Sequence, residues 1–446
     1  MLTFLNRHVV WPLVAKKRGS RHLHYHTLLE RSQYDSPAVH ARRQFLLLRA
    51  MVDHAYARVP FYRTAWAAAG VHPTDLTKLE DLAHFPEVTK AALRADPTAF
   101  HSDRVDQTRV RVKRTSGSTG VPLTIHLDEP AAQWKAACTL RSDEWSGYRL
   151  GQRVAKVWGN PEYRHDGYRG RLRNALLDRA VYLDTRHVTD DRIERFVKAV
   201  RRHRPGLVFG HAHSLYLVAL KLRKLGVDDI RPNGVISTAM PLHGFQRAAI
   251  EAVFGVPVTD RYGCEEVSLI ASQCERHAGL HVAAESVLTE VGPDGHLLVT
   301  DLVNLAMPLI RYRVGDVVTP GGACGCGRGL PVLAGVTGRD ADYVLLPDGG
   351  LVSGISLTEN FALLIPGAAQ VQVVQVSLTR LTIRMVADDG FTDGSRRKVA
   401  ELVRDTFGPT VKHDLELVAA IPQEASGKYR FCVSRPAEEY IQNLSV

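Results

Sequence analysis

The segment Thr115-Ser116-Gly117-Ser118-Thr119-Gly120, followed by Val121-Pro122, is the most informative stretch of this chain. Its glycines allow the backbone to approach a ligand closely, and its successive N–H groups and hydroxyls can surround a phosphate. Residues 110–114 and 123–127 alternate in the manner of strands, so we expect the segment at the tip of a hairpin. Because Val121 follows Gly120, the mononucleotide P-loop is excluded. A serine- and glycine-rich surface turn is the alternative for so short a motif.

The composition is that of an ordinary globular protein, with 446 residues, 45% of them hydrophobic and 23% charged. This length suits one large domain and a smaller one. The chain starts with apolar residues, as a secretory signal does, but Arg7 interrupts them and Lys16-Lys17-Arg18 follow. No apolar run approaches the roughly 18 residues that cross a bilayer. We therefore predict a cytoplasmic protein with no membrane partner.

The formal charge of +10 raises the question of a nucleic-acid or acidic-membrane partner. The basic residues are spread along the chain, and an anionic small substrate explains them equally well, so we predict no nucleic-acid partner. With only six cysteines in a chain of this length, a disulfide framework is not expected.

The pattern of apolar residues predicts an α/β protein. Residues 27–70 have helical periodicity that ends at Pro60, and a further helix is expected from about 130 to 145. From 150 onwards strands and helices alternate, which favours a parallel-type layered sheet. The closing part has paired strands at 371–376 and 381–386, a helix at 395–407 and a strand at 413–418. We predict a large layered domain over 1–338 and a small, mobile α+β domain over 339–446.

Four further motifs follow the first in the chain. Each has an ordinary structural explanation when it is taken alone, such as a helix start, a Gly-Asp turn or a basic turn. In chain order, and with Gly338-Arg339 between the last two, they are Ser237-Thr238-Ala239-Met240-Pro241, Asp260-Arg261-Tyr262-Gly263-Cys264-Glu265-Glu266, Met307-Pro308-Leu309-Ile310-Arg311-Tyr312-Arg313-Val314-Gly315-Asp316 and Ala425-Ser426-Gly427-Lys428-Tyr429-Arg430.

The order of these motifs resembles that of the adenylate-forming superfamily. It is most similar to the phenylacetate–coenzyme A ligase-like branch, which includes proteins of the capsule-biosynthesis type. The resemblance covers roughly residues 40–435 and implies a large N-terminal domain followed by a small, rotating C-terminal domain. Met240 and Glu265 depart from the family pattern, which has an acidic residue and a serine or threonine at these positions.

The resemblance also implies a role for individual residues. The first motif would bind the ATP phosphates, and the second would line the nucleotide and acyl pocket. Asp260 would contact adenine, Tyr262 would stack on it, Glu266 would hold Mg²⁺, and Asp316 would bind both ribose hydroxyls. Lys428 would be the catalytic lysine. The nucleotide-binding residues implied are therefore Thr115, Ser116, Gly117, Ser118, Thr119, Gly120, Ser237, Thr238, Ala239, Asp260, Tyr262, Asp316 and Arg339.

A structural zinc site is expected beside these motifs. Cys274 and His281 follow the acidic motif, and Cys324 and Cys326 follow Asp316, which together form a Cys₃His set. His277 is an alternative to His281, and free buried cysteines are the alternative to a metal.

We predict an enzyme that activates a small carboxylic acid with ATP and Mg²⁺ and transfers the acyl group to coenzyme A. The alternatives are transfer to an amine, a hydroxyl or a carrier-protein thiol, or a non-catalytic zinc-containing protein that binds nucleotides. A homodimer is left open, and the sequence does not specify the acid.

Overall fold

The computed structural model describes residues 2–114, 123–158, 167–185, 188–292, 295–337, 343–353, 357, 361, 364–421, 432–437 and 439–440. These residues belong to two compact units. The first comprises 2–114, 123–151 and 259–337, and the second comprises 152–258 and the residues from 343 onwards. The predicted division into 1–338 and 339–446 remains a prediction, because the proposed boundary lies outside the described residues.

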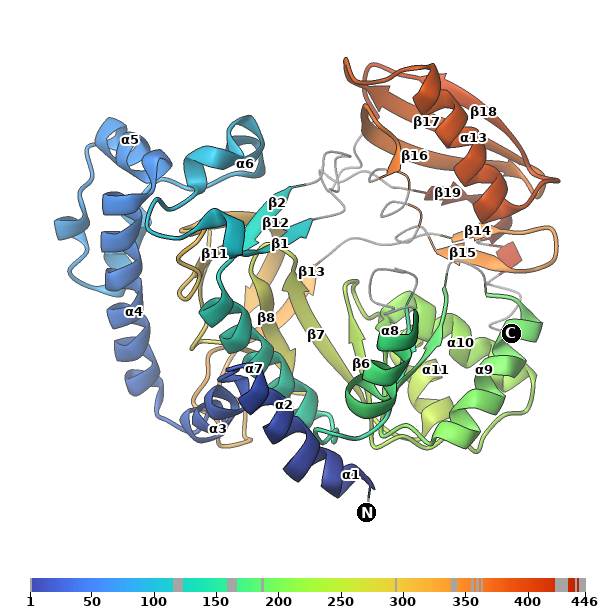
Figure 1. Cartoon of the computed structure of the whole chain (residues 1–446), viewed down its shortest axis with the longest axis horizontal. Coiled ribbons are helices and arrows are strands. Elements are labelled where there is room, and N and C mark those ends of the chain that lie inside the picture. The colour runs from blue at the N-terminus through green and yellow to red at the C-terminus, as the bar shows by residue number, and fades with distance from the viewer. Residues whose placement is uncertain are drawn as a thin grey trace. The chain divides into compact units, whose positions relative to one another are not determined.

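The helices of the first unit lie mainly in its N-terminal part (Figure 1). Four short turns lie on either side of α6, between α5 and the first strand. They are η2 (Pro73–Asp75), η3 (Leu79–His84), η4 (Pro97–Phe100) and η5 (Gln107–Arg109). The helices are α1 (Leu2–Leu5), η1 (Asn6–Val10), α2 (Trp11–Lys17), α3 (His22–Ser32), α4 (Pro37–Arg58), α5 (Pro60–Ala69), α6 (Lys90–Ala95) and α7 (Glu129–Trp145).

The predicted break at Pro60 separates α4 from α5. The Ser36 side chain accepts a hydrogen bond from the Val39 N–H at the start of α4. Val59, which precedes the proline, is extended, and Pro60 then occupies the first position of α5. Gly70 ends α5 with a left-handed φ of 67°. The buried face of α4 contributes Leu48, Met51, Val52 and Ala55 to the main core of this unit.

The strands of the first unit form a mostly antiparallel arrangement. A hairpin pairs β1 (Arg111–Arg114) with β2 (Thr124–Leu127), which confirms the predicted flanks of the hydroxyl-rich segment. The remaining strands pair in the order β10-β11-β12-β13-β9-β8-β7, all antiparallel. They are β7 (Val258–Cys264), β8 (Ser268–Gln273), β9 (Leu280–Val282), β10 (Val287–Val291), β11 (His296–Asp301), β12 (Tyr312–Pro320) and β13 (Val332–Thr337).

Helix α7 packs against these strands through buried charged groups as well as apolar ones. Arg141 binds the Glu285 carboxylate with two bonds of 2.7 and 3.1 Å, and both side chains are buried. Lys135 of the same helix binds Asp301 at 2.5 Å. Removal of one partner from a buried pair typically costs about 3–5 kcal/mol, so these pairs fix α7 in register with the strands.

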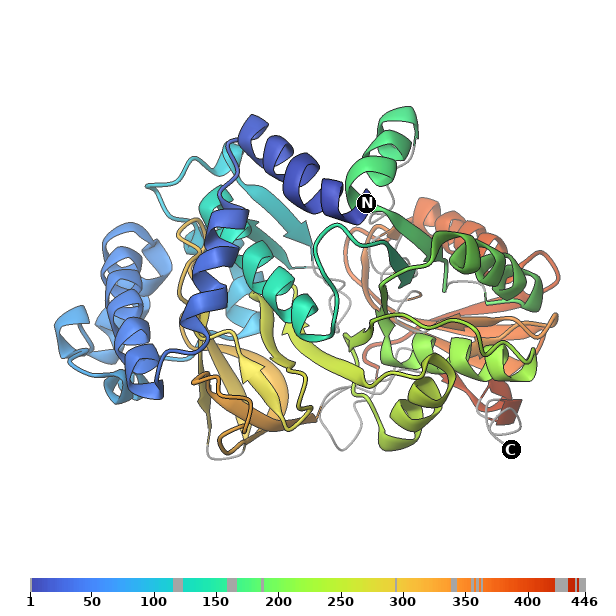
Figure 2. The same cartoon turned by 90° about the horizontal axis from the view of Figure 1, so that it is seen from below.

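The second unit contains the parallel sheet predicted from the alternating pattern. Its strands pair in the order β6-β5-β3-β4, with every pair parallel. Helices α9, α10 and α11 pack on it through an apolar core (Figure 2). The elements are β3 (Val154–Val157), α8 (Gly167–Arg173), η7 (Asn174–Asp178), β4 (Ala180–Leu183), α9 (Asp190–His203), β5 (Leu207–His211), α10 (Ala212–Lys224), β6 (Gly234–Thr238) and α11 (Gly244–Phe254).

The C-terminal part of the second unit has the α+β elements that were predicted for it. A small hairpin pairs β14 with β15, and a second sheet has the order β18-β17-β16-β19. The core under α13 joins Val399 and Phe407 of this helix to Val373 and Ile383 of the sheet. The elements are β14 (Tyr343–Leu345), β15 (Leu351–Ser353), β16 (Ala368–Ser377), β17 (Arg380–Ala387), α13 (Asp393–Phe407), β18 (Lys412–Leu417) and β19 (Cys432–Ser434).

Among the helices in the described part of the chain, none combines the length and the apolar composition of a bilayer-spanning segment.

Candidate functional site

The acidic motif, Asp260–Glu266, begins in β7 and ends with Glu265 and Glu266 in the tight connection between β7 and β8. The two strands are antiparallel, with Tyr262 opposite Ala271 and Cys264 opposite Ser268, and the register shifts between Tyr262 and Gly263. A Cβ atom on Gly263 would overlap the backbone oxygen of Ser268. Only glycine therefore allows the two strands to approach closely enough for this turn to present Glu265 and Glu266.

Glu266 is a buried carboxylate with charged and hydrogen-bonding partners. Only 6% of its surface is exposed, the Tyr312 hydroxyl donates to its Oε1 at 2.8 Å, and the Lys90 Nζ lies 3.5 Å from the same oxygen. Burial by itself raises the pKa of the Glu266 carboxyl, but the Lys90 charge, a backbone N–H and the Tyr312 hydroxyl outweigh it and lower the pKa. Glu266 is therefore ionised at neutral pH, as a ligand of Mg²⁺ must be.

Arg311 holds the segment that carries Lys90. Its guanidinium donates to the backbone oxygens of Ala83 (3.0 Å) and Phe85, and it also binds Glu290 at 3.1 Å. The Val88 N–H donates to the Arg311 oxygen at 3.0 Å, and the Arg313 N–H donates back to the Val88 oxygen at 2.9 Å. Through these bonds the residues just before α6 lie against the start of β12, which brings Lys90 to Glu266.

Asp316 projects from a bulge in β12. His296 of β11 pairs with Val317 of β12, and Leu298 pairs with Arg313. A step of two residues on β11 therefore corresponds to a step of four on β12, so β12 has two extra residues here. Gly315 has a φ of 94°, which favours glycine and lets the extra residues leave the ladder. The Tyr262 hydroxyl donates to Asp316 Oδ2 at 2.9 Å. Burial, followed by the Asp316 charge, raises the pKa of Tyr262, so the phenol keeps the proton that it donates.

The structure thus brings Tyr262, Glu266 and Asp316 together in the first unit. Asp260 lies on the same strand as Tyr262, half-buried, and its backbone N–H donates to Gln273 Oε1 at 3.0 Å. The unusual Glu265 is exposed and lies 3.7 Å from Lys113 Nζ, which also donates to Ser268 Oγ at 2.9 Å. Glu265 therefore adds a second negative charge to the β7–β8 turn and faces the end of β1.

The four predicted zinc ligands form one cluster in the first unit. Their ligand atoms all lie within 4.8 Å of one another. The Cys274 and Cys324 sulfurs are 3.8 Å apart, and the Cys326 sulfur is 3.4 Å from His281 Nε2. A tetrahedral zinc with about 2.3 Å sulfur bonds separates two thiolates by about 3.8 Å, whereas a disulfide needs about 2.0 Å. The spacing therefore fits a four-ligand metal site, with His281 rather than His277 as the nitrogen ligand.

The second unit buries polar groups at the carboxyl ends of its parallel strands. Thr185 follows β4, His211 ends β5, and Ser237 is the last residue but one of β6. Each of these side chains is at most 1% exposed. The Thr185 and Ser237 hydroxyls and both ring nitrogens of His211 have no hydrogen-bond partner among the described residues. Burial lowers the pKa of His211 to about 3, so its ring is neutral. Unpartnered buried polar atoms are costly, and ligands of such sheets bind at this edge.

Ser237, Thr238 and Ala239, which were predicted to line the nucleotide and acyl pocket, lie at this edge. Thr238 is half-buried, and Ala239 is exposed with a left-handed φ of 68°. Met240, where the family has an acidic residue, is buried and packs on Ala212. Where the family has a carboxylate, this chain therefore has an apolar contact between Met240 and Ala212, the first residue of α10.

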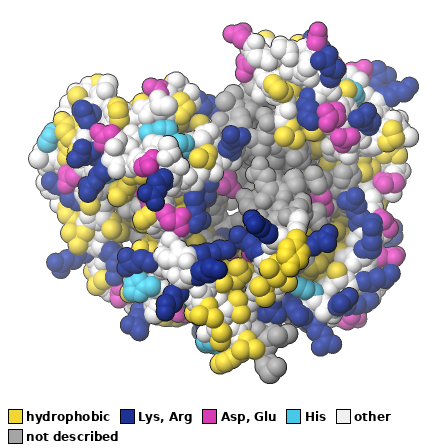
Figure 3. Space-filling view, in the orientation of Figure 1, with side chains coloured by type: hydrophobic (Ala, Val, Ile, Leu, Met, Phe, Trp, Pro, Cys, Tyr) yellow, Lys and Arg dark blue, Asp and Glu magenta, His cyan; other side chains and the backbone are white. Residues whose placement is uncertain are grey.

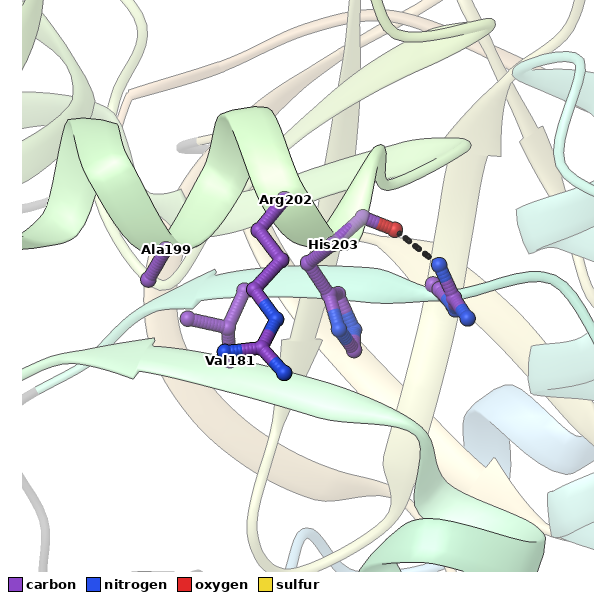
Figure 4. A pocket seen from close by; sticks show the side chains of 5 residues that line it. Val181, Ala199, Arg202 and His203 are labelled. Atoms are coloured by element: carbon purple, nitrogen blue, oxygen red, sulfur yellow. Dashed lines mark hydrogen bonds between the residues drawn. The ribbon is translucent and has the colours of Figure 1, made fainter.

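A pocket of about 280 Å³ lies at the opposite end of these strands (Figure 4). It is lined by Arg153, Val181, Ala199, Arg202 and His203. Arg153 donates to the backbone oxygen of His203 at 2.8 Å, and His203 Nε2 lies 2.7 Å from the backbone oxygen of Arg179. This pocket opens at the amino ends of the strands, whereas Thr185, His211 and Ser237 lie at the carboxyl ends. We therefore do not assign the pocket to the candidate site.

Several predicted residues lie outside the described part of the chain. They are Thr115, Ser116, Gly117, Ser118, Thr119, Gly120, Arg339 and Lys428.

The chain is similar in sequence to several known proteins. The family model "CapK C-terminal domain" matches residues 344–435. The phenylacetate–coenzyme A ligase of Thermus thermophilus is 26% identical over 424 residues, which cover 86% of this chain and 94% of the relative. The ligase of the same name from Aromatoleum evansii is 29% identical, with 67% and 70% covered. Protein CapK of Staphylococcus aureus is 20% identical, with 79% and 80% covered.

The fold has a counterpart among solved structures. A 2-hydroxyisobutyryl-CoA ligase in complex with 2-HIB-AMP and CoA superposes with a TM-score of 0.61, at 21% identity, over 93% of this chain and 94% of the ligase. The chain thus resembles the phenylacetate–coenzyme A ligases and protein CapK in sequence, and the 2-hydroxyisobutyryl-CoA ligase in fold. The adenylate-forming resemblance, its CapK-like branch and the α/β fold class predicted from the sequence are therefore confirmed.

Sequence reasoning missed two partners of Glu266. Tyr312 was part of a recognised motif but had no assigned role, and Lys90 was not singled out at all. The alternation of Tyr312, Arg313 and Val314 at the start of β12 was a usable signal, because alternate residues of a strand face opposite sides of the sheet. Lys90 carried no signal, since its approach to Glu266 depends on contacts between segments far apart in the chain.

We predict that Gly263→Ala disrupts the acidic turn. The added methyl group has to displace the Ser268 backbone, so the free energy of unfolding should fall by about 1–3 kcal/mol. Urea denaturation monitored by circular dichroism measures this change. Gly322→Ala is the matched control, because a Cβ atom there meets nothing within 4 Å. Equal stability of the two variants would contradict the close packing inferred for Gly263.

Proposed function

We propose that this protein is an AMP-forming ligase that joins a carboxylic acid to coenzyme A. In the first step a carboxylate oxygen attacks the α-phosphorus of ATP, the bond to the β-phosphate breaks, and pyrophosphate leaves. In the second step the coenzyme A sulfur attacks the acyl carbon and loses its proton, and the carbon–oxygen bond to AMP breaks. The relatives named phenylacetate–coenzyme A ligase support this reaction class.

The observation that carries the proposal is the pair of carboxylates on neighbouring motifs of the first unit. Glu266 is buried, ionised and held by Tyr312, which suits an oxygen ligand of Mg²⁺. Asp316 leaves the β12 ladder with Tyr262 bound to one oxygen, which suits a double acceptor for two ribose hydroxyls. Mg²⁺, when bound, would offset the negative charge of the phosphates during the displacement.

Other parts of the chain would complete the site. We assign the phosphate contacts to 115–120, a ribose or phosphate contact to Arg339, and the stabilisation of charge on the α-phosphate to Lys428. Asp260 would bind the adenine, and Tyr262 would contact its face. These assignments rest on the order of the motifs.

The polar edge of the second unit is a candidate subsite for the acid. Thr185, His211 and Ser237 bury hydrogen-bonding groups that have no described partner. A site of this kind discriminates against a substrate that leaves such groups unpaired. We therefore expect an acid that carries a hydrogen-bonding group to react faster than a hydrocarbon acid of the same shape.

We further propose that Cys274, His281, Cys324 and Cys326 bind a structural zinc ion. The cluster supplies four protein ligands at tetrahedral spacing, which leaves no open position for a substrate. Such an ion would tie the loop after β12 to the end of β8 and to β9, and these strands adjoin those that carry Glu266 and Asp316.

The catalytic proposal predicts acid-dependent release of pyrophosphate from ATP. A panel should include phenylacetate and the isosteric pair 2-hydroxyisobutyrate and pivalate, each with and without coenzyme A. Lys428→Ala should slow pyrophosphate release by about 100-fold or more. Lys412→Ala is the control, because this lysine lies exposed at the start of β18.

The same assay separates the alternatives. A thioester that forms only with coenzyme A supports the proposal, and an acyl-adenylate that ignores coenzyme A would indicate an amine, hydroxyl or carrier-protein acceptor. ATP binding without any acid-dependent pyrophosphate would indicate a non-catalytic nucleotide-binding protein. Parent-rate turnover by Lys428→Ala would refute the role given to that lysine.

The zinc proposal predicts about one zinc ion per chain in protein purified without chelators. Cys274→Ser and Cys326→Ser should lose the metal and unfold at a lower temperature, because zinc no longer joins the three segments. Cys138→Ser is the matched control, since Cys138 is also a buried free cysteine but lies outside the cluster. Metal analysis by mass spectrometry decides the matter. Parent protein with no zinc, or a Cys274→Ser variant with full occupancy, would rule the site out.

A further inference from the structure

The N-terminal helices expose an apolar surface. Helices α1, η1 and α2 run without interruption from Leu2 to Lys17. Phe4 and Leu13 are 66% and 61% exposed, and Leu5 and Val9 are each 42% exposed. Hydrophobic side chains gather over α1 and α2 on the face shown in Figure 3. The exposed positions come in pairs four residues apart: Phe4, Leu5, His8, Val9, Pro12, Leu13, Lys16 and Lys17.

This helical segment is apolar on its outward side as well as on its inward side, where Ala15 is buried and Val10, Trp11 and Val14 are half-buried. Asn6 is buried, next to Gly151, whereas Phe4 and Leu13 face outward. A helix that covers a globular core normally turns its apolar stripe inward. Residues four apart lie near one another on an α-helix, and the wider turn of η1 helps to keep the first pairs on the same side as those of α2. An outward apolar ridge of this kind is typical of a surface that meets another apolar phase.

The ridge ends in a cluster of positive charge. Lys16, Lys17 and Arg18 are exposed at the end of α2, Arg21 follows, and the first acidic residue of the chain is Glu30. An anionic bilayer offers both matching features, since its headgroups attract lysine and arginine and its acyl region accepts phenylalanine and leucine. A nucleic acid would match the charges but not the ridge. A second copy of the chain, paired through the same surface, would bring two positive clusters into one interface.

We propose that the segment 2–21 binds the surface of an anionic lipid bilayer. The helices would lie in the plane of the interface, with Phe4, Leu5, Val9 and Leu13 inserted at the headgroup–acyl boundary and Lys16, Lys17 and Arg18 among the headgroups. This is attachment to one leaflet by a helix too short to span a bilayer. It departs from the sequence-based expectation of no membrane partner, and it is independent of the reaction proposed above.

Co-sedimentation of the full chain with vesicles tests the proposal. The vesicles contain phosphatidylcholine alone or with about 30% phosphatidylserine, a composition that gives a strongly negative surface. The apparent affinity should be at least about tenfold higher for the anionic vesicles and should fall when salt is raised from about 0.1 to 0.5 M. Equal binding to both kinds of vesicle, or no binding to either, would overturn the proposal.

Charge-matched variants assign the binding to this surface. Phe4→Glu/Leu13→Glu and Lys16→Glu/Lys17→Glu should each weaken binding to anionic vesicles by about tenfold or more. The controls, Leu46→Glu/Val376→Glu and Lys224→Glu/Lys412→Glu, make the same charge changes at exposed positions elsewhere and should bind like the parent. Because all these side chains are exposed, circular dichroism should show no change in any variant.

The remaining outcomes are also decisive. If Phe4→Glu/Leu13→Glu binds vesicles like the parent, the ridge is not a bilayer-binding surface. If the same variant converts a dimer into a monomer in analytical ultracentrifugation, and the parent does not sediment with vesicles, the occupant is a second copy of the chain. If the control variants lose vesicle binding to the same extent, the binding depends only on the net charge of the protein. That result would contradict a binding surface confined to segment 2–21.

Discussion

The hydrogen bond from the Tyr312 hydroxyl to the Glu266 carboxylate joins two of the recognised motifs within one core. A buried carboxylate is unfavourable unless hydrogen bonds and an opposite charge compensate it. Here Tyr312 supplies the hydrogen bond, and Lys90 supplies the charge from a segment much earlier in the chain. Lys90 in turn depends on Arg311, which binds the backbone before α6 to the start of β12. The ionised state of Glu266 is therefore a property of the folded first unit as a whole.

The same unit uses departures from regular strand geometry to present its acidic side chains. Gly263 lets β7 and β8 come together at the turn that carries Glu266, and Gly315 permits the bulge that carries Asp316. Tyr262 then holds one Asp316 oxygen. The two glycines explain why these motifs have the form Tyr-Gly and Gly-Asp: the glycine provides the backbone conformation, and its neighbours provide the chemistry.

Most of the elements could be predicted from the sequence because they rest on local signals. The helical stripe that ends at Pro60, the alternation of strands and helices after 150, and the paired strands near 371–386 all follow from periodicity and from proline. The association of Cys274, His281, Cys324 and Cys326 was predicted from proximity to the motifs, although only the pairing of β8, β9 and β13 explains why His281 rather than His277 joins the group. By contrast, Lys90 could not be found, because an ion pair between distant segments leaves no local pattern. The outward apolar ridge was also missed, since it depends on which side of the N-terminal helices packs on Gly151.

The central claim is that the first unit binds ATP through Glu266 and Asp316. The most direct measurement is the dissociation constant of ATP in the presence of Mg²⁺, determined by calorimetry for the parent and for Asp316→Asn. This change keeps the shape of the side chain but removes the charge and one acceptor, so the constant should rise by about tenfold or more. An Asp316→Asn protein that binds ATP as tightly as the parent would contradict the claim.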